Sequence, residues 1–207
     1  MKLHIGGTER LDGWTVLNTN DIPEVTDIVG NAVDLSMIGD ETCDEVYASH
    51  VLEHLGYESD LPKALTEIQR VLTPMGVFSI GVPDLLILCR LFCESANGLE
   101  EKVALMRVMY GGRVDKFDEH RTGMDADILS MMLGRAGFVV AERVPPFTLF
   151  NDMSRICFKG VPFTLCMKAY KHMDAAKGVT GIQAPVEAPP DDEPPPLVKI
   201  SDLNPED

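Results

Sequence analysis

Short apolar runs rich in β-branched residues alternate along the chain with longer segments of helical periodicity. The runs typical of strands are Lys2–Ile5, Thr15–Leu17, Asp27–Val29, Asp44–Ala48 and Val77–Val82. Helices are expected from Asp60 to Leu72 and over Leu85–Glu94, Leu99–Tyr110 and Asp125–Ala136. Two closing strands are expected at Phe138–Arg143 and Pro162–Tyr170. This alternation predicts an α/β domain with a mainly parallel sheet.

The connections between the first three expected strands are unusually short. Residues 6–14 and 19–26 provide nine and eight residues, whereas a parallel crossover usually needs a dozen or more, including a helix. Either these crossovers are reduced to a single turn, or this part of the sheet departs from the standard doubly wound plan.

The composition changes near Gly178, which divides the chain into a domain of residues 1–177 and a tail of residues 178–207. The tail holds seven of the 14 prolines, and its seven acidic residues and one lysine give it a charge of 1 − 7 = −6 out of the total of −15. Such a segment buries too little apolar surface to offset its ordering entropy. We therefore expect a disordered, acidic, Pro-rich tail that either stays solvated or docks a partner protein.

The charge and the cysteine content restrict the partners and the compartment. A net charge of −15 repels phosphate backbones and anionic lipids, which argues against nucleic-acid and membrane-surface binding. No apolar run approaches the roughly 18 residues of a membrane span, and Gly6-Gly7 interrupts the N-terminus before a secretory signal could form. Five cysteines in such a chain are expected to be reduced, mostly buried thiols in the cytoplasm. The sequence is also compatible with a homodimer.

Polar and glycine residues follow the first four expected strands. In doubly wound sheets, ligands bind outside the carboxyl ends of the strands, where the strand order reverses. Four segments would meet there: Gly6-Gly7-Thr8, Asn18, residues 30–35, and Ser49-His50. Glycine lets the backbone approach a ligand, and a polar side chain can bind a ribose, so the set suits a nucleoside cofactor. A glycine pair is equally common in ordinary turns.

Several segments of the sequence resemble the motifs of a known protein family. The most specific block extends from Asp44 to Pro83, and weaker blocks include residues 2–7, 109–112, 120–124, 151–154 and 160–165. In this order they resemble the class I S-adenosylmethionine-dependent methyltransferases, in particular small predicted methyltransferases of surface-polysaccharide biosynthesis. The resemblance covers residues 2–170. It implies a Rossmann-like class I methyltransferase sheet with short N-terminal crossovers and a C-terminal antiparallel strand.

The resemblance also implies a site and a reaction. S-adenosylmethionine would be the cofactor, and its methyl group would pass to an oxygen or nitrogen of a small-molecule or saccharide acceptor. The implied cofactor-binding residues are Gly6 and Gly7 at the methionine part, Asn18 at the ribose, Asn31 and Ala32 at the adenine, and Ser49 and His50 beneath the sulfonium. Candidates for the catalytic base are His50, His54 and His120, because histidine titrates near neutral pH. His54 could equally be structural, and His120 could be a surface residue.

Four positions depart from the family pattern. Thr8 stands at a usual glycine, Asn18 and Asn31 stand at usual carboxylates, and Met75 stands in a Pro-Gly-Gly turn that often needs a positive φ. An ionised acceptor makes the stronger hydrogen bond, so Asn18 would cost about 1–2 kcal/mol of cofactor affinity. The alternative function is therefore a non-catalytic methyltransferase-like protein that binds a partner through its surface or tail.

Residues 50–54 also match the H-x-x-E-H pattern of inverted zinc proteases, in which two histidines one turn apart bind the metal. That site requires a long helix and a third ligand from another helix. Here the pattern directly follows the strand Asp44–Ala48, and a third ligand would have to come from Glu100 or Glu101. We therefore expect no metal site.

Overall fold

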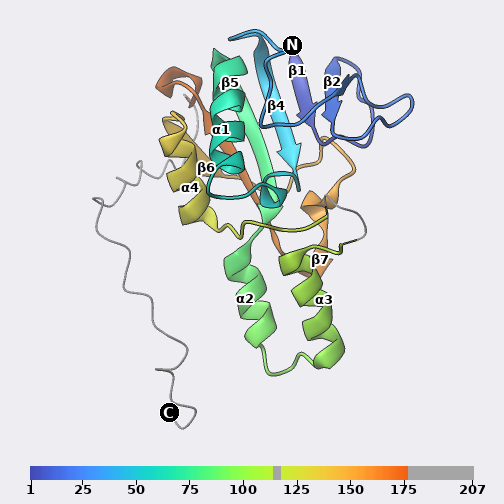
Figure 1. Ribbon diagram of the computed structural model, residues 1–207. Helices are drawn as coiled ribbons and strands as arrows, with labels where there is room; N and C mark the ends of the chain where they lie inside the picture. Colours follow the sequence, from blue (N-terminus) through green and yellow to red (C-terminus); the bar gives the residue numbers. More distant parts are fainter. Residues whose placement is uncertain (114–117, 177–207) are drawn as a thin grey trace.

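A seven-stranded sheet forms the centre of the protein in the computed structural model, which describes residues 1–113 and 118–176 (Figure 1). The strand order is β3-β2-β1-β4-β5-β9-β6. The strands are β1 (Lys2–Ile5), β2 (Trp14–Asn18), β3 (Ile28–Val29), β4 (Cys43–Ser49), β5 (Leu72–Pro83), β6 (Val140–Arg143) and β9 (Thr164–Tyr170). Strands β1 to β5 are parallel, and β9 runs antiparallel to both β5 and β6. The prediction of a mainly parallel sheet with a C-terminal antiparallel strand is confirmed; the tail, residues 178–207, lies outside the described residues.

The four predicted helices are present: α1 (Asp60–Val71), α2 (Leu85–Cys93), α3 (Leu99–Tyr110) and α4 (Ala126–Arg135). The spacing of Leu61, Leu65 and Ile68 places all three on the buried face of α1, where they join the main core. Helices α1 and α4 lie on the same face of the sheet (Figure 1). Strand β5 begins immediately after α1, so Met75 lies in extended backbone with a negative φ rather than in the expected turn.

The short connections between the first four strands contain turns but no helix in the part of the chain that is described. This settles the alternative that the sequence left open, because the sheet keeps its parallel order without helical crossovers. Helices α1 and α4 leave the second face of β1 and β4 uncovered. On that face Trp14 and Tyr47 pack against Phe150 and Phe147, and His4 stacks on Phe150 with ring centroids 3.9 Å apart. The segment after β6 thus takes the place of the missing helices.

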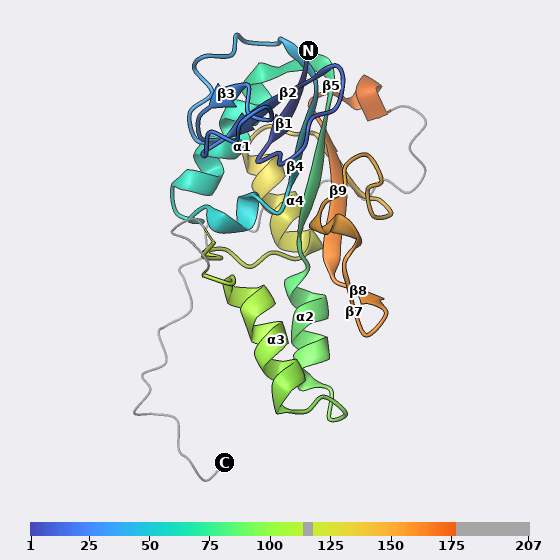
Figure 2. The same cartoon turned by 90° about the vertical axis from the view of Figure 1, so that its right-hand side faces the viewer.

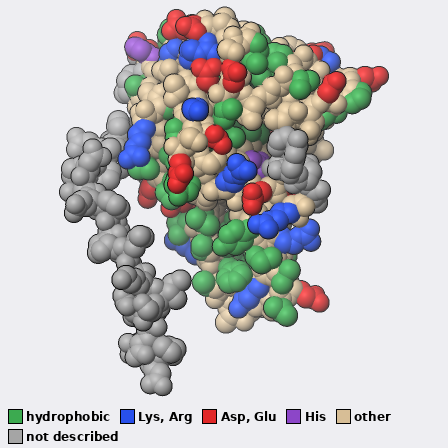
Figure 3. All heavy atoms as spheres, viewed as in Figure 1, with side chains coloured by type: hydrophobic (Ala, Val, Ile, Leu, Met, Phe, Trp, Pro, Cys, Tyr) green, Lys and Arg blue, Asp and Glu red, His purple; other side chains and the backbone are tan. Residues whose placement is uncertain are grey.

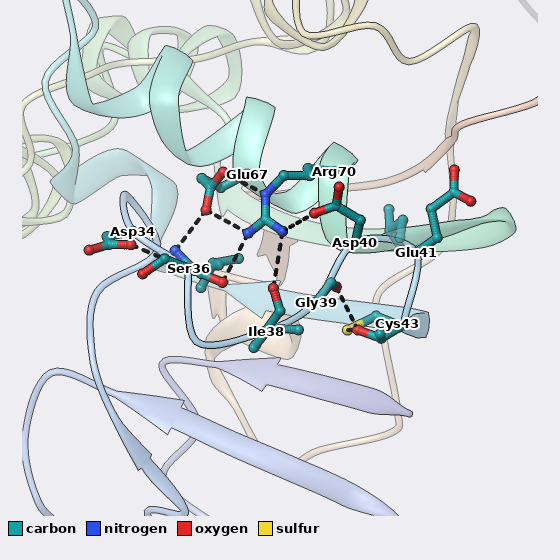
Figure 4. A network of polar contacts seen from close by, with 12 residues as sticks. Asp34, Ser36, Ile38, Gly39, Asp40, Glu41, Cys43, Glu67 and Arg70 are labelled. Carbon is teal, nitrogen blue, oxygen red and sulfur yellow. Dashed lines mark hydrogen bonds and ion pairs between the residues drawn. The ribbon is translucent and has the colours of Figure 1, made fainter.

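Arg70 of α1 holds the connection between β3 and β4 in place (Figure 4). Its guanidinium donates to the carbonyl oxygens of Leu35 and Ile38 and to Asp40 Oδ1, at 2.9, 3.0 and 2.5 Å. Glu67, one turn earlier, receives two further bonds from Arg70 and accepts the Leu35 amide at 2.9 Å. This network lowers the pKa of Glu67 through its hydrogen bond with Arg70. A fixed guanidinium thus orders a loop that lacks secondary structure.

Helices α2 and α3 form a hairpin that projects away from the sheet (Figure 2). They pack on each other through Leu88, Leu91 and Leu105, while further apolar side chains gather on the outer surface of this hairpin (Figure 3). Cys89 and Cys93 are exposed here, as is Cys157. The expectation of mostly buried thiols is therefore wrong, although all five cysteines are free.

The remaining short elements are η1 (Leu52–His54), after β4, and four elements after β6. Those four are η2 (Met153–Arg155), the strand pair β7 (Cys157–Phe158) and β8 (Val161–Pro162), and η3 (Met173–Ala176). Across residues 1–113 and 118–176, every helix falls short of the length and apolarity needed to cross a membrane.

Candidate functional site

A cavity of about 760 Å³ opens at the carboxyl ends of β1, β2 and β4. Strand β1 lies between β2 and β4, so the order in which the chain adds strands to the sheet reverses at β1. Doubly wound sheets bind their ligands at such a reversal. The lining includes Gly6, Asn18, Asn31, Ala32, His50 and His54, six of the predicted site residues. The other three that were predicted and are described, Gly7, Ser49 and His120, lie outside the lining.

Both glycines after β1 are required by sterics. Gly6 has a φ of +74°, and a Cβ there would lie 2.5 Å from Val51 Cγ2. A Cβ on Gly7 would lie 2.6 Å from the His4 ring. Since real Cβ atoms do not come so close to other heavy atoms, neither position accepts a side chain without local rearrangement. Gly6 thereby gives the cavity a bare backbone wall, while Gly7 packs on the opposite side.

Asn18, at the end of β2, uses its side chain to join two loops. Its Nδ2 donates to the Gly7 carbonyl oxygen at 2.9 Å, and its Oδ1 accepts the Asn20 amide at 3.0 Å. The residue is only 8% exposed. One lone pair of Oδ1 remains for a ligand, because an amide oxygen can accept two hydrogen bonds. The main contact of the side chain is therefore with the glycine loop, and only the remaining lone pair of Oδ1 can accept a hydrogen bond from a ribose.

Asn31 and Ala32 follow β3 at the rim of the cavity. Asn31 is exposed, and its Oδ1 accepts the Val33 amide at 3.2 Å in a local turn. Ala32 is buried against the main core. Ser49 ends β4 and points at Gly81 of β5, where a Cβ would meet its Oγ at 2.9 Å. The structure therefore turns Ser49 toward the sheet.

His50 adopts an uncommon backbone conformation directly after β4. Its φ is +53°, in the left-handed region that non-glycine residues rarely occupy. The ring is held on both sides, with Nε2 3.1 Å from Thr164 Oγ1 and Nδ1 3.1 Å from Glu53 Oε1. Thr164 in turn donates to the Met153 carbonyl oxygen at 3.2 Å.

Residues 52–54 form a single 3₁₀ turn, η1 (Leu52–His54), against which a distant segment docks. The amides of Arg121 and Thr122 donate to the Glu53 carbonyl oxygen at 2.7 and 3.1 Å. This brings the His120 ring to 4.9 Å from the His54 ring, centroid to centroid. Burial lowers the pKa of His120 below its usual value. The predicted histidines thus form one cluster at the edge of the cavity.

Sequence reasoning missed several residues at the mouth of the cavity. Asp60, Asp118, Glu119 and Arg121 line it, and Glu53 lies buried behind it. The H-x-x-E-H pattern was the available signal for Glu53. No local pattern could place residues 118–121 beside η1, because the contact joins segments more than 60 residues apart.

Comparison with known proteins agrees with this arrangement. A family described as a methyltransferase domain matches residues 13–80, which cover β2 to most of β5 and leave out the glycine loop. No curated protein matches the sequence. Among solved structures, 1,6-didemethyltoxoflavin-N1-methyltransferase of Burkholderia thailandensis, with bound 1,6-didemethyltoxoflavin and S-adenosylhomocysteine, is 18% identical with a TM-score of 0.54. The alignment covers 83% of this chain and 70% of that chain. The fold is that of a Rossmann-like methyltransferase.

Two further methyltransferase structures have similar scores. An S-adenosylmethionine-dependent methyltransferase from Archaeoglobus fulgidus is 16% identical with a TM-score of 0.51, over 81% of this chain and 84% of that one. A putative methyltransferase from Haloferax volcanii, in complex with the Trm112 methyltransferase activator, is 16% identical with a TM-score of 0.51. That alignment covers 83% of this chain and 82% of that one. At these identities the likeness concerns the methyltransferase fold.

Proposed function

We propose that the protein is an S-adenosylmethionine-dependent methyltransferase that acts on a small-molecule or saccharide acceptor. The observation that supports this most is the Gly6 wall at the strand-order reversal, which opens into a cavity of about 760 Å³. A cavity of this size suits a nucleoside-sized ligand. A side chain at Gly6 would collide with Val51, which also lines the cavity, so the backbone stays bare at this wall and supports a fit to the cofactor.

The residues around the cavity divide into two ends. Gly6, Asn18, Asn31 and Ala32 would hold the cofactor at the ends of β1, β2 and β3. The opposite end, near η1, contains three carboxylates and one guanidinium: Asp60, Asp118, Glu119 and Arg121. An excess of negative charge favours a cationic sulfonium. We therefore expect the methyl group to face the histidine cluster.

When bound, the cofactor would supply a methyl group on a positively charged sulfur for transfer to the acceptor oxygen or nitrogen, with S-adenosylhomocysteine as the leaving group. A hydroxyl acceptor must also lose a proton. His54 is the best placed of the three candidate bases, because its Nδ1 lies 3.2 Å from the Glu119 carbonyl oxygen. If Nδ1–H donates there, Nε2 keeps a lone pair. Both ring nitrogens of His50 face protein groups, Thr164 and Glu53, so His50 is less available as a base.

Isothermal titration of the full chain with S-adenosylhomocysteine and with S-adenosylmethionine, in metal-free buffer, tests the proposal. We expect micromolar binding of both. Asn31→Ala should weaken it several-fold, because Asn31 orders the rim of the cavity. Asn151→Ala is the matched control, since Asn151 is exposed and does not line the cavity. A folded protein that shows no heat at millimolar ligand would overturn the proposal in favour of a non-catalytic, partner-binding protein.

A further inference from the structure

We propose that Glu53, His54 and His120 form a binding site for a divalent metal cation at the mouth of the cavity. One ligand atom from each residue lies within 4.8 Å of the others, among the residues that the structure describes. This departs from the sequence-based expectation of no metal site. The third ligand that the H-x-x-E-H pattern lacked is His120, delivered by the docked segment, and not Glu100 or Glu101.

Glu53 is the first reason to expect a cation there. The residue is 1% exposed, and neither carboxylate oxygen accepts a hydrogen bond from the described residues. Burying a charged group without partners is costly, and nearly all buried polar atoms in proteins have a partner. The His50 ring lies beside Glu53 as well, with Nδ1 3.1 Å from Oε1. A buried carboxylate next to three imidazoles can bind a metal cation together with them.

The orientation of His54 is the second reason. Its Nδ1 lies 3.2 Å from the Glu119 carbonyl oxygen, which can only accept, so Nδ1 is the protonated nitrogen. The neutral ring then presents the Nε2 lone pair on its other side. Histidines that bind metals almost always donate their second N–H to a carbonyl or carboxylate in this way.

The contact between His50 and Glu53 is the third reason. Because Thr164 donates its proton to Met153, its oxygen accepts from His50 Nε2–H. The other ring nitrogen, Nδ1, faces Glu53 Oε1 at 3.1 Å. Two ligands about 2.1 Å from one ion are about 3.0 Å apart when they are at right angles, so His50 fits as a fourth ligand.

Binding requires only a small adjustment. Two atoms that are both about 2.1 Å from one ion cannot be more than about 4.2 Å apart. The three ligand atoms now lie within 4.8 Å of one another, so they must move closer together when an ion binds. A set of imidazoles with one carboxylate suits Zn²⁺, Fe²⁺, Co²⁺ or Mn²⁺ better than Ca²⁺.

The site has a consequence for the reaction, and this part rests on the proposed function. Of the four candidate ligands, His50 and His54 line the cavity, so an acceptor hydroxyl in the cavity can reach the ion from their side. A metal-bound hydroxyl loses its proton more readily, so the proton would pass to water and His54 would serve as a ligand rather than as the base. The acceptor would then be a molecule that carries a hydroxyl group able to reach the ion.

The test is titration of the metal-free full chain with ZnCl₂ and with MnCl₂, without cofactor or acceptor, and with CoCl₂ as an absorbance probe. We expect one equivalent to bind. Glu53→Gln and His120→Ala should each weaken binding at least ten-fold. His172→Ala is the control, because His172 is exposed and lies outside the cluster. Circular dichroism shows whether each variant is folded; Glu53→Gln preserves shape and should fold even if His120→Ala does not.

Two outcomes would overturn the inference: no stoichiometric binding of any of the three ions by the folded wild-type chain, or equal affinity in wild type, Glu53→Gln and His172→Ala. The cofactor titration in metal-free buffer separates this failure from failure of the proposed function. A chain that binds S-adenosylhomocysteine but no metal contradicts only the metal site. One that binds metal but no S-adenosylhomocysteine contradicts only the methyltransferase assignment.

Discussion

Asn18 replaces a carboxylate that the resemblance would place at the ribose, and its contacts give the reason. Nδ2 donates to the Gly7 carbonyl oxygen at 2.9 Å. In Asn18→Asp an oxygen would take that place, so two acceptors would face each other in a buried site. We expect the free energy of unfolding to fall by about 1–3 kcal/mol, and affinity for S-adenosylhomocysteine to fall with it. Urea unfolding and isothermal titration measure the two quantities.

Asn20→Asp is the control for this substitution, because Asn20 is exposed and contacts Asn18 through its backbone amide. A stable Asn18→Asp variant that binds the cofactor more tightly would contradict the bracing role. It would instead show that the side chain turns toward the ribose, as an ionised acceptor there makes the stronger bond.

His4 gives the protein a pH dependence of its own. It is 5% exposed among aromatic rings, and burial lowers its pKa from 6.5 to about 4. Between these values the unfolded chain binds a proton that the folded chain does not, so the free energy of unfolding falls as the pH falls from 6.5 to 4. The loss should reach about 3 kcal/mol. Urea unfolding of wild type and His4→Phe between pH 7.5 and 4.5 isolates this effect; parallel curves would contradict it.

The sequence predicted which residues lie at the site better than it predicted the direction and contacts of their side chains. Gly6, Asn18, Asn31 and His50 follow from their positions after strands, because parallel strands end at one edge. The orientation of Asn18 toward Gly7 depends on a turn that no pattern encodes. Ser49 was expected at the cavity floor, but its side chain points at Gly81.

At the scale of elements, the predicted strands and helices are present in the structure. They could be predicted because the spacing of apolar residues shows which face of each element is buried. The aromatic cover over β1 and β4 was not predicted. Phe147 and Phe150 lie 100 and 103 residues after Tyr47, and nothing local marks them as a substitute for crossover helices. The early start of β5 was also missed, because Pro74 suggested a turn where β5 instead begins beside an irregular register with β4.

Arg70 takes over the role of a crossover helix by ordering residues 34–40. Arg70→Lys keeps the charge but cannot reproduce a planar fork that reaches two carbonyls and two carboxylates at once. We expect the free energy of unfolding to fall by about 1–3 kcal/mol. Affinity for S-adenosylhomocysteine should fall as well, because the ordered loop continues from Asn31 and Ala32.

Urea unfolding and isothermal titration measure these effects, with Arg135→Lys as the control. Arg135 is exposed at the end of α4, on an element that does not line the cavity. Equal stability of both variants would mean that the loop is ordered by its apolar residues Leu35 and Ile38 alone.

At the scale of the whole molecule, the acidic charge is divided between two regions with different expected roles. Residues 1–177, which we expect to form the domain, include the described residues of the cavity, the histidine cluster and the Arg70 network. Its share of the charge is −15 + 6 = −9. The acidic mouth of the cavity therefore belongs to the domain itself, and the attraction of a cationic cofactor does not depend on the tail.

Removal of residues 178–207 tests this division. The composition of the tail predicts that it adds no apolar core, so the chain 1–177 should differ from the full chain by no more than about 0.5 kcal/mol in its free energy of unfolding. Affinity for S-adenosylhomocysteine should stay within two-fold in the same buffer. Urea unfolding and isothermal titration of both chains give the comparison. A larger loss of either quantity would make the tail part of the folded unit, while unchanged values would leave it free to act as a docking segment for a partner.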